Sequence, residues 1–213
     1  MDVGALGAID GVLISHDHRD HLDLASLRQL AGDGVELVMP EGTARHVREL
    51  GFGSVTELAV GVSTAVAGVR VTATPARHDG GRHPFGAPGE CVGYLVGDDR
   101  RVYFAGDTDL FPEMESIGER LDAALLPVWG WGTTVGPGHL TPRSAAQALA
   151  LLKPRLAVPI HWGTLFPAGL GRFRRPLLSD PPHEFAREAA RIAPEVEVRV
   201  LQPGASTLLP APP

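Results

Sequence analysis

The chain has 213 residues, of which 44% are hydrophobic and 21% are charged, and its net charge is −6 at pH 7. This length and composition predict a single globular domain over residues 1–213, and the acidic balance argues against a nucleic-acid-binding protein, which is normally basic. The single cysteine, Cys91, excludes an internal disulfide, and the lack of a signal-peptide pattern or of an apolar stretch of about 18 residues predicts a cytoplasmic protein with no integral membrane segment.

Short strand-like runs alternate with helical patterns along the chain, with no linker or internal repeat between them. Strands are expected near residues 11–15, 35–39, 62–66, 69–76, 92–97, 101–105, 123–128, 155–160 and 196–202, and helices near 22–31, 42–50, 112–120, 141–152 and 182–193. Strands in series with helices predict an α/β fold.

The most informative segment follows the first predicted strand and reads Ser-His-Asp-His-Arg-Asp-His-Leu-Asp over residues 15–23. Neutral imidazole and carboxylate groups are the donors that zinc and similar divalent ions take. Because side chains i and i+2 of an extended segment point the same way, His16 and His18 can bind one ion together. Asp20 and His21 fall where the chain turns into the next helix, so they are directed at a second point. A satisfied polar turn would need only one or two of these residues, and the segment therefore predicts two metal ions.

Three further potential ligands each follow a predicted strand. They are His78 after the run 69–77, Asp107 after 102–106 and His161 after 156–160. With the segment at residues 15–23, four strand ends carry potential ligands, which predicts a site at one edge of the sheets.

The remaining histidines are weaker candidates for metal ligands. His83 is the rival to His78, but it follows the strand by several residues and precedes a proline. His46 lies in the short amphipathic pattern 42–50, so we expect it to be solvated on the surface. His183 follows two prolines at a helix start, where capping or solvent explains it equally well.

Taken together, these segments resemble the metallo-β-lactamase superfamily of metallohydrolases. The resemblance covers essentially the whole chain, and it runs in the family's order through His16-x-His18-x-Asp20-His21, Pro75-Ala-Arg-His78, Gly106-Asp107-Thr108 and Pro159-Ile-His161-Trp-Gly-Thr164. It is strongest to the branch that holds the ascorbate-phosphate lactonases and the N-acyl-phosphatidylethanolamine phospholipases D.

The resemblance implies a four-layer αβ/βα sandwich with two divalent metal ions, of which zinc is the first choice and manganese the second. It implies that His16, His18 and His78 hold one ion and that Asp20, His21 and His161 hold the other. Asp107 would bridge the two ions. Relatives usually carry several strands before the metal loop, so we expect this chain to lack the usual N-terminal strands and to be less stable than a longer form or to self-associate as a homo-oligomer.

Two Gly-rich loops, 129–139 and 164–175, are expected to build a pocket for a small-molecule substrate. Trp131 would contribute to an apolar wall, and Arg172 and Arg174 would bind a substrate anion, although an exposed basic loop explains the arginines equally well. His139 is a candidate proton donor to the leaving group or an oxyanion partner, with a structural histidine as the alternative.

The predicted function is hydrolysis of a small anionic ester, either a phosphodiester or a lactone, by a metal-bridging hydroxide whose proton Asp20 steers. The alternative is a metal-binding family member that is catalytically weak or inactive. All seven expected ligands are present, which favours the enzyme. Dioxygen chemistry on iron is a third option, but the diiron flavoprotein branch carries Glu where this chain has His18.

Overall fold

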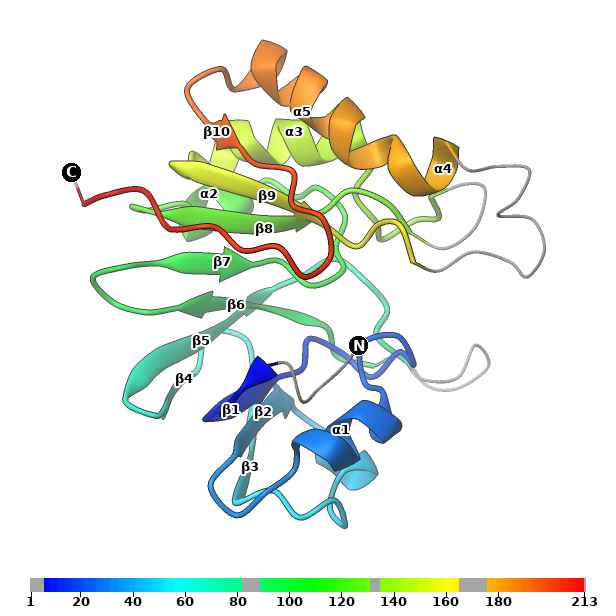
Figure 1. The fold of residues 1–213 in the computed structure, drawn as a ribbon, viewed down its shortest axis with the longest axis vertical. Coiled ribbons are helices and arrows are strands. Elements are labelled where there is room, and N and C mark those ends of the chain that lie inside the picture. The colour runs from blue at the N-terminus through cyan, green and yellow to red at the C-terminus, as the bar shows by residue number, and fades with distance from the viewer. Residues whose placement is uncertain (1–5, 82–88, 131–134, 165–175, 213) are drawn as a thin grey trace. The chain divides into compact units, whose positions relative to one another are not determined.

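The computed structural model describes residues 6–81, 89–130, 135–164 and 176–212 (Figure 1). The chain divides into two compact units, of which the first comprises Met1–Pro75 and Asp79–Tyr94 and the second comprises Ala76–His78 and Leu95–Pro213. Strand β6 (Val92–Val96) contributes residues to both units. The expectation of one domain over residues 1–213 stays a prediction.

The first unit contains a parallel sheet in the order β1-β2-β3 and an antiparallel hairpin. The sheet strands are β1 (Gly11–Leu13), β2 (Glu36–Pro40) and β3 (Ser54–Leu58), and the hairpin strands are β4 (Ser63–Val66) and β5 (Val69–Pro75). Helix α1 (Leu24–Leu30) and the 3-10 helix η2 (Ala44–His46) complete this unit. Its core gathers Ile14, Leu22, Leu27, Leu37, Met39 and Val47, so the residues on either side of the 15–23 segment are anchored in one apolar cluster.

The second unit contains a parallel sheet segment in the order β10-β9-β8-β7. Its strands are β7 (Val102–Phe104), β8 (Ala123–Pro127), β9 (Leu156–Ile160) and β10 (Glu197–Val198), and its helices are α2 (Met114–Ile117), α3 (Pro142–Leu152), α4 (Pro176–Ser179) and α5 (Pro181–Ile192). Since parallel strands end at one edge of a sheet, the residues that follow β7, β8 and β9 are brought to the same edge.

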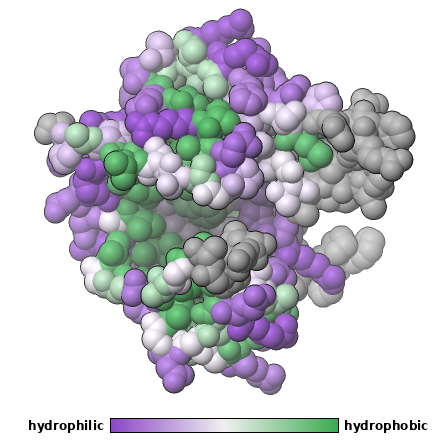
Figure 2. Space-filling model, in the orientation of Figure 1, coloured by the Kyte–Doolittle hydropathy of each residue, from purple (hydrophilic) through white to green (hydrophobic). Residues whose placement is uncertain are grey.

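The helices of the second unit follow from their amphipathic patterns and their caps. Leu149 of α3 and Phe185 of α5 are fully buried in a cluster that also includes Leu126 of β8, while hydrophilic residues lie along the outer side of α5 (Figure 2). Thr141 and Ser144 form a reciprocal capping box at the start of α3. The helix therefore begins at Pro142, three residues after His139.

The expected α/β class is confirmed, and most predicted elements are present within one or two residues. Strand β3 and helix α4 were not predicted. β3 lies at the edge of its sheet and is mostly exposed, so its sequence carries no apolar signal. The expected helix 42–50 is present only as η2, and the expected strand 196–202 only as the two-residue β10. Cys91 is buried as a small apolar side chain. Within the described residues, none of the helices is both long and apolar enough to cross a membrane.

Candidate metal centre

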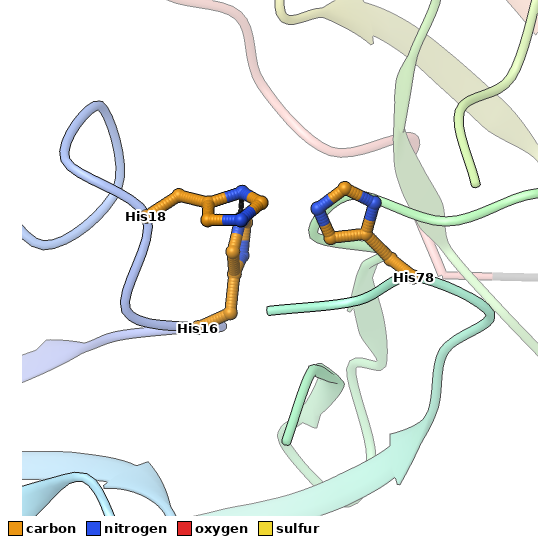
Figure 3. Close-up of side chains that lie close together, drawn as sticks. All are labelled: His16, His18 and His78. Carbon is orange, nitrogen blue, oxygen red and sulfur yellow. Dashed lines mark hydrogen bonds between the residues drawn. The ribbon is translucent and has the colours of Figure 1, made fainter. Parts of the chain in front are cut away.

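Two ring nitrogens converge directly after β1. Nε2 of His16 lies 3.1 Å from Nδ1 of His18 (Figure 3), and the ring centroids of His16 and His21 are 4.1 Å apart. The Oγ atom of Ser15 is 3.0 Å from Nδ1 of His16 and 3.5 Å from Nδ1 of His21. Ser15 therefore orients two imidazoles and leaves Nε2 of His16 directed toward His18, as a pair of ligands to one cation would be.

This loop is held at both of its ends. At the start, the hydroxyl of Tyr94 donates to the carbonyl of Ile14 at 2.8 Å, and the N–H of Val92 donates to the carbonyl of Ser15 at 2.9 Å. At the end, the N–H of Leu22 donates to the carbonyl of His18 at 2.7 Å, and the carboxylate of Asp23 caps α1 by accepting from two backbone N–H groups. The backbone on either side of the histidines is therefore fixed by these contacts.

Asp20 and His21 lie at the turn between the loop and α1. Nε2 of His21 is 3.8 Å from Oδ2 of Asp20, and the Asp20 side chain is 31% exposed. Asp20 therefore remains accessible to solvent, which suits a group that exchanges protons with water.

In the second unit, a buried carboxylate lies among imidazoles. Oδ2 of Asp107 is 3.5 Å from Nε2 of His161 and 3.6 Å from Nε2 of His139, and its side chain is only 3% exposed. His78, Asp107 and His139 each offer a ligand atom within 4.8 Å of the others. Three imidazoles and one carboxylate thus gather at the edge where β7 and β9 end.

Backbone carbonyls orient all three of these imidazoles. Nδ1 of His78 donates to the carbonyl oxygen of Gly138 at 2.9 Å. In the same way, Nδ1 of His161 donates to that of Trp129 at 2.8 Å, and Nδ1 of His139 donates to that of Pro137 at 3.2 Å. Because a carbonyl can only accept, the hydrogen lies on Nδ1 in each ring, and a neutral ring then presents a lone pair at Nε2. This is the arrangement that metal-binding histidines have, with the second nitrogen held by a backbone or carboxylate acceptor.

The backbone turns sharply at three of these positions. Gly106 (φ 62°) precedes Asp107 and Gly138 (φ 79°) precedes His139, while His161 itself has φ 58°. A non-glycine residue in this region costs about 1 kcal/mol, and such residues cluster at functional sites. The turn at His161 follows directly after β9, so it redirects the ring toward Asp107.

Thr108 ties the loop of His78 to the loop of Asp107. The N–H of Arg77 donates to Oγ1 of Thr108 at 2.9 Å, and the N–H of Asp109 donates to the carbonyl of Arg77 at 3.1 Å. Thr108 is fully buried, so it connects two segments that are far apart in the sequence. The Gly106-Asp107-Thr108 motif thus supplies a candidate ligand and its support.

Asp107 also sets the electrostatics of His139. The hydrogen bond with the Asp107 carboxylate raises the pKa of His139 above its ordinary value, and its charge adds to this effect, while burial of the ring acts in the opposite direction. His139 therefore keeps its proton to higher pH than a free imidazole does.

Each half of the predicted ligand set is gathered within its own unit. The first unit brings together His16, His18, Asp20 and His21, and the second brings together His78, Asp107 and His161 with His139. Trp131, Arg172 and Arg174, and also His83, lie outside the described residues.

Sequence reasoning missed one pair and placed one histidine wrongly. His46 is not a solvated surface residue, because its side chain is only 22% exposed and its Nε2 lies 3.1 Å from Oδ2 of the buried Asp17. Asp17 stands between the two predicted ligands His16 and His18, and its alternation with them was the signal that could have pointed to a partner behind the loop.

Known proteins share both the sequence and the fold of this chain. Residues 2–162 match the beta-lactamase superfamily domain. A UPF0173 metal-dependent hydrolase of Methanopyrus kandleri is 35% identical over 211 residues, which cover 92% of this chain and 81% of that protein. The metallo hydrolase Igni18 from Ignicoccus hospitalis is 29% identical with a TM-score of 0.68, over 92% of this chain and 77% of that one. The metallo-beta-lactamase fold protein YhfI from Bacillus subtilis has a TM-score of 0.66 at 14% identity, over 91% of this chain and 75% of that one, and shares the fold. The chain belongs to the metallo-β-lactamase superfamily.

Proposed function

We propose that this metal-dependent hydrolase uses two divalent ions to cleave a small anionic ester such as a phosphodiester or a lactone. Zinc is the metal that we expect, and manganese is the alternative. Metal-dependent hydrolysis is the activity named for the relative from Methanopyrus kandleri. The observation that carries the finer proposal is the common orientation of His78, His139 and His161, whose Nδ1 atoms each donate to a backbone carbonyl.

The donor set fits a divalent ion. In the second unit, His78 and His161 have Nε2 available next to the buried Asp107 carboxylate, and imidazole and carboxylate are the ligand types that zinc takes in catalytic sites. In the first unit, the 3.1 Å approach of two ring nitrogens provides a second group of the same chemistry. The ligand assignment follows the family pattern: His16, His18 and His78 for one ion, Asp20, His21 and His161 for the other, and Asp107 for both.

Divalent ions in such a site would acidify a water to near neutral pH and polarise the oxygen of the scissile bond. Asp20 is the group that would accept the proton of that water, because its carboxylate is partly exposed. His139 would carry a proton at Nε2 and donate it to the leaving group, and its raised pKa favours the protonated ring that this role needs.

The substrate class follows from charge. A net charge of −6 disfavours the tracking of a long polyanion, whereas a single anionic group can be bound by a local pair of arginines. We assign this role to Arg172 and Arg174, and an apolar contact to Trp131.

The test combines metal analysis with a substrate panel. Elemental analysis of protein that was never exposed to chelator should find about two divalent ions per chain. Hydrolysis of bis(p-nitrophenyl) phosphate or of a lactone should be lost with EDTA and restored by zinc or manganese. Protein without metal would remove the basis of the proposal. Two bound ions without hydrolysis of either class would favour the catalytically inactive alternative, and processive cleavage of RNA would show that the substrate class is wrong.

A further inference from the structure

A buried carboxylate lies between the two histidines of the metal loop. The side chain of Asp17 is 1% exposed, although its neighbours in the sequence are His16 and His18. Removing a carboxylate from water is expensive unless it is paired and hydrogen-bonded. The Asp17 carboxylate therefore requires partners, and the structure supplies them from η2.

His46 and Arg45 are partners of this carboxylate. Nε2 of His46 lies 3.1 Å from Oδ2 of Asp17, within hydrogen-bond distance, and Nη2 of Arg45 lies 3.6 Å from the same oxygen. A carboxylate only accepts, so Nε2 of His46 is the donor. The His46 side chain is 22% exposed and that of Arg45 is 60% exposed. His46 thus makes the shorter and better shielded contact, and Arg45 makes an exposed ion pair of the kind that contributes little.

His46 is itself held firmly in place. Ala44 at the start of η2 donates its N–H to Oε1 of Glu57 in β3 at 2.7 Å, and Oγ1 of the buried Thr43 donates to the carbonyl of Pro40 at the end of β2 at 2.5 Å. The next residue, Val47, is 1% exposed and packs in the same cluster as Ile14. The strands β2 and β3 therefore fix the position from which His46 reaches Asp17.

The contact bears directly on the geometry of the two ligands. Asp17 stands between His16 and His18 in the sequence, and its carboxylate contacts His46 while the ring nitrogens of its two neighbours converge at 3.1 Å. Fixing Asp17 through His46 restricts the rotation of the backbone that carries both rings. Without this contact the two nitrogens would have to be brought together when an ion binds, at a cost in affinity.

We propose that His46 is a positioning residue, which holds Asp17 by a hydrogen bond and thereby preorganises His16 and His18 for one metal ion. This inference rests on the proposed metal centre. It assigns a role to a histidine that lies 29 positions from Asp17 in the sequence and is not among the expected ligands.

The experiment measures Co²⁺ affinity of the full chain, by visible absorption and by competition with a chelator, for wild type and four variants. His46→Ala removes the donor, and His46→Gln keeps an N–H donor at about the same reach. Arg45→Ala removes the exposed partner, and His183→Ala is the matched control, since His183 is an exposed histidine on α5. The urea midpoint of each metal-free protein is measured in parallel to separate binding from folding.

We expect His46→Ala to weaken the binding of one Co²⁺ ion about 10-fold or more, with His46→Gln restoring most of the affinity. Arg45→Ala should lower the Co²⁺ affinity less than His46→Ala does, and His183→Ala should leave the Co²⁺ affinity unchanged. Unaltered Co²⁺ affinity in His46→Ala, with or without a lower urea midpoint, would overturn this inference while leaving the metal centre standing. Equal losses of Co²⁺ affinity in His46→Ala and His46→Gln would also overturn the positioning role of His46. A wild-type protein that binds no Co²⁺ would instead overturn the proposed metal centre, and this inference with it.

Discussion

The carbonyl oxygen of Gly138 accepts a hydrogen bond from Nδ1 of His78 at 2.9 Å, although 60 positions separate the two residues. This contact sets the tautomer and the direction of the His78 ring, so that Nε2 is presented for binding. It requires a residue without a side chain at position 138, because a Cβ there would lie 3.0 Å from Nδ1 of His78 and the backbone has φ +79°.

Gly138→Ala should therefore weaken metal binding while the protein still folds. The left-handed backbone costs alanine about 1 kcal/mol, and displacement of His78 should lower metal affinity about 10-fold. The measurement is a zinc competition titration with a circular dichroism spectrum of each variant. Gly136→Ala is the matched control in the same loop, since its Cβ would meet nothing within 4 Å. Identical affinities for the two variants would show that the Gly138 carbonyl does not orient His78.

Asp107→Ala should abolish hydrolysis and lower the metal content of the purified protein. The reason is that this buried carboxylate faces His139 and His161 and is assigned to both ions. Metal content by elemental analysis and activity on bis(p-nitrophenyl) phosphate are measured together, with Asp99→Ala as the exposed control. Full metal content in Asp107→Ala would contradict the bridging role.

His139→Ala should retain its metal and slow turnover, most strongly for substrates with poor leaving groups. General acid catalysis is typically worth about 10²–10⁴-fold in rate, and an activated leaving group needs little of it. Rates are compared on a p-nitrophenyl ester and on an unactivated alkyl ester of the same acid. A uniform change on both substrates would assign His139 a structural role instead.

Asp122→Asn should lower stability near neutral pH and have little effect in acid. Burial acts to raise the pKa of Asp122, but the N–H of Arg101 and the guanidinium groups of Arg100 and Arg155 outweigh it and hold the pKa below its ordinary value. A carboxyl with a lowered pKa contributes stability above its unfolded pKa of about 3.9, and this contribution is lost as the pH falls through its folded pKa.

The free energies of unfolding of wild type and Asp122→Asn, measured by urea denaturation, should thus differ by about 1 kcal/mol at pH 7 and begin to converge as the pH falls below about 4. Asp99→Asn, at an exposed position, is the control and should follow wild type throughout. A difference between wild type and Asp122→Asn that stays constant from pH 7 to acid would show that the ionised carboxylate is not what stabilises this site.

The sequence alone was enough to single out the candidate ligands and most of the elements that carry them. His16 and His18 are two positions apart, and local geometry is enough to direct their side chains to one side. Asp107 and His161 follow apolar runs, and the rule that parallel strands end at one edge was sufficient to bring them together. The helix cap at Thr141 is also predictable from the sequence, because a capping box depends only on residues that are close together in the chain.

Only the tertiary structure decided what holds these candidate ligands in place. The acceptors for His78 and His161 are backbone carbonyls of Gly138 and Trp129, and a carbonyl is common to every residue, so no sequence pattern marks it. The contact of His46 with Asp17 likewise joins residues 29 positions apart. This contact depends on where β2 and β3 place η2. Strand β3 is an exposed edge strand, and its own sequence does not indicate that it pairs with β2. Side-chain chemistry is encoded locally, whereas orientation depends on long-range packing.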